Sequence, residues 1–123
     1  MKALIIFCFC FFILSCTDPG DNTAYGDYSG QTNQSLPIYF NVKDNNINNG
    51  YIKIRVKLSE EEVEKEFSGW YGKIDEQGKF KIYIDLDHQG RIEGAFEQDN
   101  VNGKWYYPDD DGTASGTFSV SKR

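Results

Sequence analysis

The chain offers few side chains that could do acid-base or nucleophilic chemistry. His88 is its one histidine, and its three cysteines, Cys8, Cys10 and Cys16, all lie near the N-terminus. A single histidine in a turn cannot form a Ser-His-Asp or Cys-His arrangement, and a zinc site there would need carboxylates as its other ligands. We therefore predict that His88 is an exposed turn residue.

Carboxylate pairs could hydrolyse a glycosidic bond if two acids were held about 5–10 Å apart on opposite sides of a sugar. The acids of this chain stand mainly in predicted turns and on the polar faces of predicted strands. Nothing in their pattern indicates a desolvated acid, so the sequence predicts that the protein is not an enzyme.

Aspartates gather in two turns of the second half of the chain. Residues 85–92, DLDHQGRI, begin like an EF-hand calcium loop, with Asp at the first and third places and Gly at the sixth. They do not form an EF-hand, because Phe96 stands at the twelfth place, where a bidentate Glu is needed. In a meander, this turn and the turn at residues 109–112 would share one rim. The candidate calcium ligands are Asp85, Asp87, Asp109, Asp110 and Asp111. The alternative is that Asp and Gly simply make good turns.

Aromatic residues cluster in two stretches that could serve as a binding surface. Trp105 and Tyr107 alternate with Tyr106, so one of these faces points away from the core. Exposed Tyr and Trp are favoured anchors at interfaces. The candidate surface residues are Trp70, Tyr71 and Tyr106. The alternative is that these rings do ordinary core packing.

The dominant hydrophobic period from residue 36 onward is two. Residues 36–42, 52–58 and 80–86 alternate apolar with polar side chains, as half-buried strands do. Turn residues recur about every 10 residues, which suits hairpins and leaves no room for crossover helices. The pattern therefore predicts antiparallel strands in meander order.

Residues 59–67, SEEEVEKEF, are ambiguous. Ser59 and Glu62 have the spacing of a helix capping box. The same glutamates also alternate with Val63 and Phe67, as in a strand. We favour a turn leading into a strand over a short helix.

A phrase of apolar, x, Gly, x, aromatic recurs along the chain. Its copies are residues 67–71, 92–96, 101–105 and 114–118. In a strand the three defined positions share one face, where a glycine marks a bend or a close approach that an aromatic ring can cover. We predict an all-β antiparallel meander of about seven strands, forming a curved sheet or small barrel.

These Gly-x-aromatic strands resemble those of small up-and-down barrels, such as the avidin-like and lipocalin-like groups and the barrels of surface lipoproteins. The resemblance implies a barrel that could hold a small ligand in a cup. The side chains that would line it are Phe80, Ile84, Phe96, Trp105 and Phe118.

The N-terminus has the pattern of an export signal. Residues 3–14 are an apolar run of 12, too short to span a bilayer comfortably, and Lys2 precedes it. The end of the run, ILSC at residues 13–16, resembles a bacterial lipobox. The resemblance implies that residues 1–15 are removed and that Cys16 is acylated. The alternatives are an uncleaved N-terminal anchor or an ordinary signal peptide cut nearby.

The rest of the chain divides into two parts. Residues 17–35 are rich in Gly, Asp, Asn, Ser and Thr without aliphatic periodicity, so we predict a flexible tether over residues 16–35. Residues 36–123 form one β domain that lacks cysteine. The formal net charge of −6 disfavours nucleic acid as a partner.

Together these features predict a lipid-anchored protein of the bacterial cell envelope, at the outer membrane. Its non-catalytic β domain would bind another envelope or extracellular protein, or have a structural role, and would need no cofactor apart from the calcium considered above. Two alternatives are a small-ligand carrier and an acidic inhibitor of a basic hydrolase, the latter acting through an exposed loop at residues 68–71.

Overall fold

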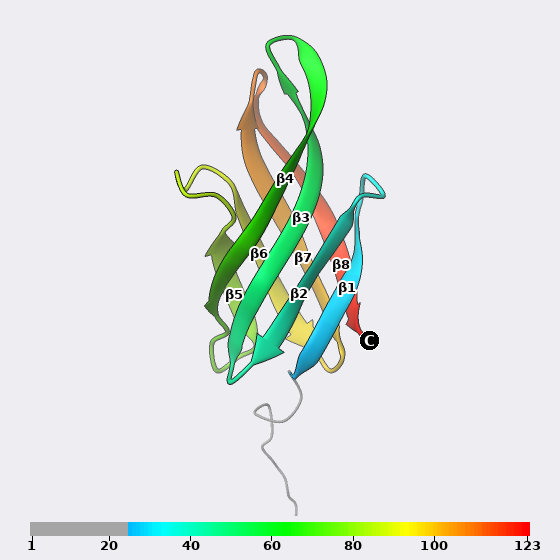
Figure 1. Cartoon of the computed structure of the whole chain (residues 1–123), viewed down its shortest axis with the longest axis vertical. Helices are drawn as coiled ribbons and strands as arrows, with labels where there is room; N and C mark the ends of the chain where they lie inside the picture. The colour runs from blue at the N-terminus through cyan, green and yellow to red at the C-terminus, as the bar shows by residue number, and fades with distance from the viewer. Residues whose placement is uncertain (1–24) are drawn as a thin grey trace, which may run out of the picture.

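Eight antiparallel strands form a nearly closed barrel in the computed structural model, which describes residues 25–123 (Figure 1). Neighbours in the sheet follow the order β4-β3-β2-β1-β8-β7-β6-β5. The strands are β1 (Gly26–Thr32), β2 (Pro37–Lys43), β3 (Asn46–Leu58), β4 (Glu61–Lys73), β5 (Lys79–Tyr83), β6 (Arg91–Glu97), β7 (Asn100–Asp109) and β8 (Gly112–Lys122). The predicted all-β meander is confirmed, with one strand more than expected.

The additional strand corrects the predicted domain boundary. The tether was expected to reach residue 35, but Gly26–Thr32 is strand β1, which pairs with β2 on one side and with β8 on the other. Two features hold β1 in the sheet: the fully buried ring of Tyr28 and the pairing of its main chain with both neighbouring strands. A strand of this kind has no aliphatic alternation, so its sequence resembles a linker. The predicted signal peptide and Cys16 lie outside the described residues.

The ambiguous segment is a turn followed by a strand, as predicted. Ser59 and Glu60 both have positive φ, 53° and 64°, which is the geometry of a two-residue type I′ hairpin turn. Leu58 faces Glu61 across this turn, and the pairing continues down the hairpin of β3 and β4. The glutamates and Val63 therefore alternate between the two faces of a strand.

Large rings lie over bare glycine backbone inside the barrel. At four glycines within the strands an added Cβ would overlap an aromatic ring from a neighbouring strand. The pairs are Gly50 with Trp70, Gly94 with Phe80, Gly103 with Phe118 and Gly116 with Trp105. The predicted relation between glycine and aromatic residues is confirmed: the missing side chain makes room for a ring in a narrow interior.

The interior contains a cluster of aromatic rings. The Phe40 ring centroid lies 5.7 Å from that of Tyr28, 6.3 Å from that of Phe80 and 6.5 Å from that of Phe96. The residues predicted to line a ligand cup are part of this packed core, Phe96 at its partly buried margin. The carrier alternative therefore gains no support from how they are arranged.

We expect Gly50→Ala to lower the free energy of unfolding by about 1–3 kcal/mol, because the new methyl group would overlap the Trp70 ring. The cost should be much smaller in a Trp70→Ala background, where the ring is gone. Urea denaturation of the two single variants and the double variant measures this coupling. Strictly additive costs would contradict it.

Candidate functional site

The barrel is open along one seam. Strands β4 and β5 follow one another in the chain, yet they stand at the two ends of the sheet order and form no ladder with each other. At the end where the chain passes from β4 to β5, Ile82 packs against Gly72, whose Cβ would lie 2.6 Å from Ile82 Cγ1. Side chains rather than main-chain hydrogen bonds thus close the barrel at this point.

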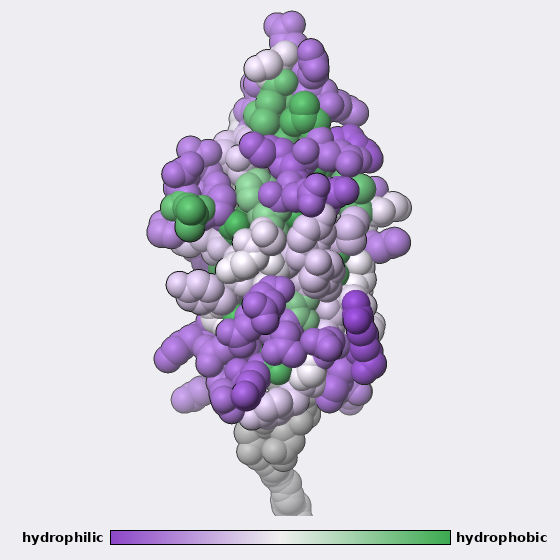
Figure 2. All heavy atoms as spheres, in the orientation of Figure 1, coloured by the Kyte–Doolittle hydropathy of each residue, from purple (hydrophilic) through white to green (hydrophobic). Residues whose placement is uncertain are grey.

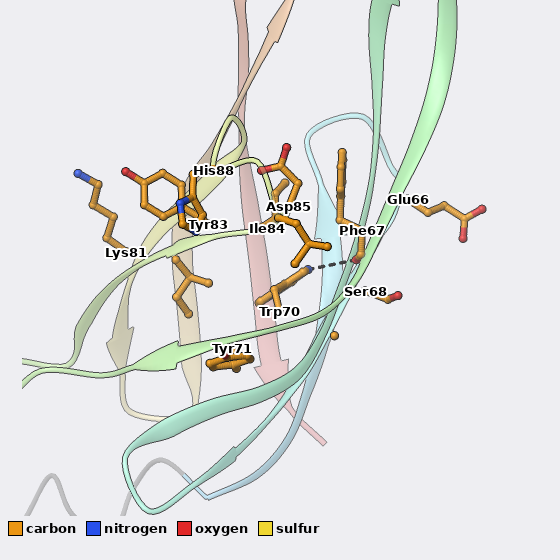
Figure 3. A pocket seen from close by; sticks show the side chains of 13 residues that line it. Glu66, Phe67, Ser68, Trp70, Tyr71, Lys81, Tyr83, Ile84, Asp85 and His88 are labelled. Carbon is orange, nitrogen blue, oxygen red and sulfur yellow. Dashed lines mark hydrogen bonds between the residues drawn. The ribbon is translucent and has the colours of Figure 1, made fainter.

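A cleft of about 550 Å³ lies along this seam, and we call it the seam cleft. One wall is residues 66–71 of β4, and the other is residues 81–86 with His88, from β5 and the loop after it (Figure 3). Its floor is apolar, since Trp70, Ile82 and Ile84 are each no more than 4% exposed.

A β-bulge at Gly69 decides which side chains of β4 enter the seam cleft. The pairing with β3 shifts there, and Gly69 has a φ of 75° with nothing within 4 Å of a built Cβ. The extra residue turns Trp70 inward, where its indole N–H donates to the Phe67 carbonyl oxygen at 3.1 Å (Figure 3). Tyr71 consequently points outward and is 74% exposed.

Three sequence predictions at this wall are therefore wrong. Trp70 is 4% exposed and is not a surface anchor. The phrase at residues 67–71 is not a copy of the repeated frame, because the bulge sends Tyr71 away from the core. The expected loop at residues 68–71 is part of strand β4, so the inhibitor alternative loses the element through which it was to act.

The opposite wall carries a second exposed aromatic ring. Tyr83 is 45% exposed, and the His88 ring lies 4.6 Å from it, centroid to centroid (Figure 3). His88 is an exposed turn residue, as predicted, with a φ of 56°. Its loop is held by Asp85, whose carboxylate accepts the N–H groups of Gln89 at 2.9 Å and Gly90 at 3.1 Å.

The tip of the same loop exposes an apolar side chain. Leu86 is 99% exposed. In Figure 2 polar residues cover most of the visible face, and an apolar spot stands out over this loop. The seam cleft therefore has aromatic rings at both lips and an exposed leucine at its border.

Tyr106 belongs to the outer face of the sheet but does not line the seam cleft. Trp105 and Tyr107 are buried, which confirms the predicted alternation. The Arg91 guanidinium lies 4.1 Å from the Tyr106 ring centroid and donates to Glu93 at 2.7 Å, a bond that raises the pKa of Arg91. Of the three predicted surface residues, only Tyr71 is both exposed and in the cleft wall.

The predicted calcium ligands do not come together. Asp109 accepts the Asp111 N–H at 2.9 Å, while Asp110 accepts the Glu60 N–H at 2.7 Å. The β7–β8 turn is thus tied to the β3–β4 turn rather than to the loop that carries Asp85 and Asp87. Within residues 25–123, no three His, Cys, Asp or Glu side chains form a group that could hold a metal ion.

A pair of stacked tyrosines lies on the outer face of β2 and β3. The rings of Tyr39 and Tyr51 stack with centroids 4.8 Å apart, and the Tyr51 hydroxyl donates to Glu66 at 2.9 Å. Partial burial, followed by the bond to Glu66, raises the pKa of Tyr51 to about 12. This links the outer face of β3 to a residue in the cleft wall.

Comparison with known proteins found no matching family, no similar curated protein and no solved structure that matches. In the described part of the chain there is no helix of the length and apolarity that crossing a bilayer requires. Function therefore has to be inferred from the geometry of this chain.

Sequence reasoning named Tyr71 on one lip of the seam cleft but missed Tyr83 on the other lip and Leu86 at the border. Alternation from Lys79 onward already placed Tyr83 on the polar face of its strand, and that signal was available. It gave no reason to single out Tyr83 or Leu86, because the pattern does not show which strands end the sheet.

We expect the Tyr51 hydroxyl to lower the free energy of unfolding as the pH rises into the alkaline range. The folded-state pKa of about 12 exceeds the ordinary value of 10.0, so the unfolded chain loses this proton first as the pH rises. Its contribution is complete below pH 10 and is lost between pH 10 and 12. Urea midpoints of wild type and Tyr51→Phe should fall by different amounts over that range, the wild type by more. Parallel curves would contradict the assignment.

Proposed function

We propose that this protein is a lipid-anchored protein of a bacterial envelope whose barrel binds another protein, without catalysis, at the seam cleft. The observation that carries the proposal is the arrangement of two exposed rings, Tyr71 and Tyr83, on opposite lips of an apolar floor. Binding sites combine such an apolar surface with a few polar groups, and aromatic residues dominate the energetics of protein interfaces.

The acids at the seam cleft support binding rather than catalysis. Glu66 accepts the Tyr51 hydroxyl, and one oxygen of Asp85 accepts two main-chain N–H groups. These carboxylates hold the surrounding structure in place. The nearby imidazole of His88 lies on the Tyr83 ring at the surface, where it can contribute to an aromatic contact area.

The meander gives the barrel an orientation relative to the proposed anchor. Strand β1 begins at Gly26, so residues 17–25, which reach at most about 30 Å when fully extended, separate Cys16 from the barrel. In an antiparallel meander the β3–β4 turn, the β5–β6 loop and the β7–β8 turn all lie at the end opposite that start (Figure 1). An anchor on Cys16 would therefore direct these loops, including Leu86, away from the bilayer.

The acidic character of that far end keeps the inhibitor of a basic hydrolase as a second candidate. Glu60, Glu61, Asp110 and Asp111 are exposed on the turns there. Negative charge would attract a basic partner and would be repelled by anionic head groups. Such an inhibitor would have to act through the far end or the seam cleft.

The anchor is tested by lipid labelling of the full chain. We expect a fatty-acid analogue to label wild type and a Cys8→Ala/Cys10→Ala variant equally, because those cysteines lie within the apolar run. Cys16→Ala should remove the label. Undiminished labelling of Cys16→Ala would refute the lipobox interpretation.

The binding site is tested by photocrosslinking in cells of the native host. A photoreactive phenylalanine analogue at position 71 or 83 of the full chain should give discrete crosslinked protein products. The same analogue at position 39 is the matched control, because Tyr39 is 43% exposed but does not line the seam cleft. Equal products at all three positions, or none at 71 and 83, would show that the seam cleft is not the binding site.

A further inference from the structure

We propose that the seam cleft takes an extended segment of a partner protein, which adds as a strand to the open edge of β4, and that this segment alternates basic with apolar residues. The inference rests on the proposed function and names the class of ligand. Strand addition uses main-chain hydrogen bonds for affinity and alternate side chains for specificity.

The β3–β4 hairpin determines which main-chain groups of β4 face the seam. Counting from its two-residue turn, the mutually hydrogen-bonded pairs are Leu58–Glu61, Val56–Val63, Ile54–Lys65 and Ile52–Phe67. The residues between these pairs point their main-chain N–H and C=O groups away from the other strand of the β3–β4 hairpin. On β4 these residues are Glu62, Glu64 and Glu66.

The other side of the hairpin confirms this count. Arg55, which faces Glu64, donates its N–H to the Gln34 side-chain oxygen at 2.8 Å, and its carbonyl accepts the Gln34 amide at 2.8 Å. Gln34 thus completes the outer edge of β3 in the way a neighbouring strand would. On the β4 side, the described residues provide no strand to pair with the same kind of edge.

The seam cleft provides apolar surface for one face of an added strand. The inward neighbours of the exposed edge are the apolar Val63 and Phe67, with Lys65 between them, and Ile84 lies across the cleft from Phe67 (Figure 3). Apolar side chains of the added segment would point into this surface. Alternation then sends the remaining side chains of the segment to the outer face.

The outer face selects basic side chains. Across β3, the row Glu62, Glu64 and Glu66 pairs with Lys57, Arg55 and Lys53. Glu64 makes ion pairs with Arg55 at 3.2 Å and Lys53 at 3.8 Å, whereas Glu62 has none within residues 25–123. A strand on the open side would place its outer residues beside the glutamates, where opposite charges stabilise and like charges destabilise.

The same charges disfavour pairing between two copies of this chain. Two β4 edges would bring their glutamate rows together. Lys65 also disfavours pairing between two β4 edges, because it is a charged residue that faces inward on an edge strand. Its ammonium lies 5.7 Å from the Tyr107 ring centroid. Inward charges on edge strands discourage indiscriminate strand pairing. The edge is therefore suited to a heterologous basic segment.

The test uses the full chain in detergent and a short synthetic peptide that alternates Lys and Val, with fluorescence anisotropy as the readout. We expect the alternating peptide to bind and a scrambled peptide of the same composition to bind at least about tenfold more weakly. N-methylation of one alternate set of peptide amides should abolish binding, and N-methylation of the other set should not, because only one set faces β4.

Protein variants separate charge from main-chain pairing. Glu62→Lys should weaken binding of the alternating peptide about fivefold to tenfold, whereas Glu76→Lys, the same charge change on the exposed β4–β5 turn at the other end of the barrel, should not. Glu64→Pro removes an N–H that faces the seam and leaves the bonds to β3 in place, so it should bind about tenfold more weakly than Glu64→Ala. Urea denaturation checks that each variant is folded. The N-methylated peptides test the same main-chain hydrogen bonds as Glu64→Pro without changing the protein.

The outcomes distinguish this inference from the proposed function. Equal binding of alternating and scrambled peptides, equal effects of both N-methylation sets, or no binding at all would overturn strand addition. If crosslinks at positions 71 and 83 persist in that case, the seam cleft still binds a protein in another way. If those crosslinks are absent as well, both proposals are wrong.

Discussion

The structure depends on the packing of large rings against glycine backbone inside a narrow barrel. A small eight-stranded barrel has little more interior than its own side chains fill. Trp70 and Trp105 fit there because Gly50 and Gly116 present no Cβ beneath them. The same contacts let the strands bend sharply, so the feature that makes room for the core also gives the sheet its curvature. Replacing either partner would disturb both the packing and the shape.

This packing also explains why the barrel remains open at one seam. Trp70 must turn inward to cover Gly50, and the Gly69 bulge achieves this by adding a residue to β4. Beyond the bulge, closure depends on contacts such as that of Ile82 with Gly72, while β5 ends at Tyr83. The β4 edge above that point faces a loop rather than a strand. An unpaired edge, an apolar floor and outward-facing tyrosines thus arise at one place.

The charge pattern around this opening favours a basic partner. Glutamates on the outer face of β4 are balanced by basic residues of β3 on one side, with no strand on the other. The turns at the far end, tied together by Asp110 and Glu60, add further negative charge. A basic partner would be attracted both by the β4 glutamates and by these acidic turns. The proposed anchor at Cys16, which precedes β1 in the chain, would hold the barrel with this end directed outward from the membrane.

The sequence alone determined the fold class. Period-two alternation, regularly spaced turn residues and the Gly-x-aromatic phrases act between near neighbours in the chain. They therefore predicted the meander, the turn and strand within residues 59–67, and the faces of Trp105, Tyr106 and Tyr107. The tertiary structure decided what depends on long-range contacts. It placed residues 26–32 in the sheet, because β1 gains its stability from β2 and β8 and not from its own pattern. It separated the aspartates of two neighbouring turns and, through one bulged glycine, exchanged the faces of Trp70 and Tyr71. The seam cleft itself exists because two strands adjacent in sequence end the sheet, a property of barrel closure that no local pattern encodes.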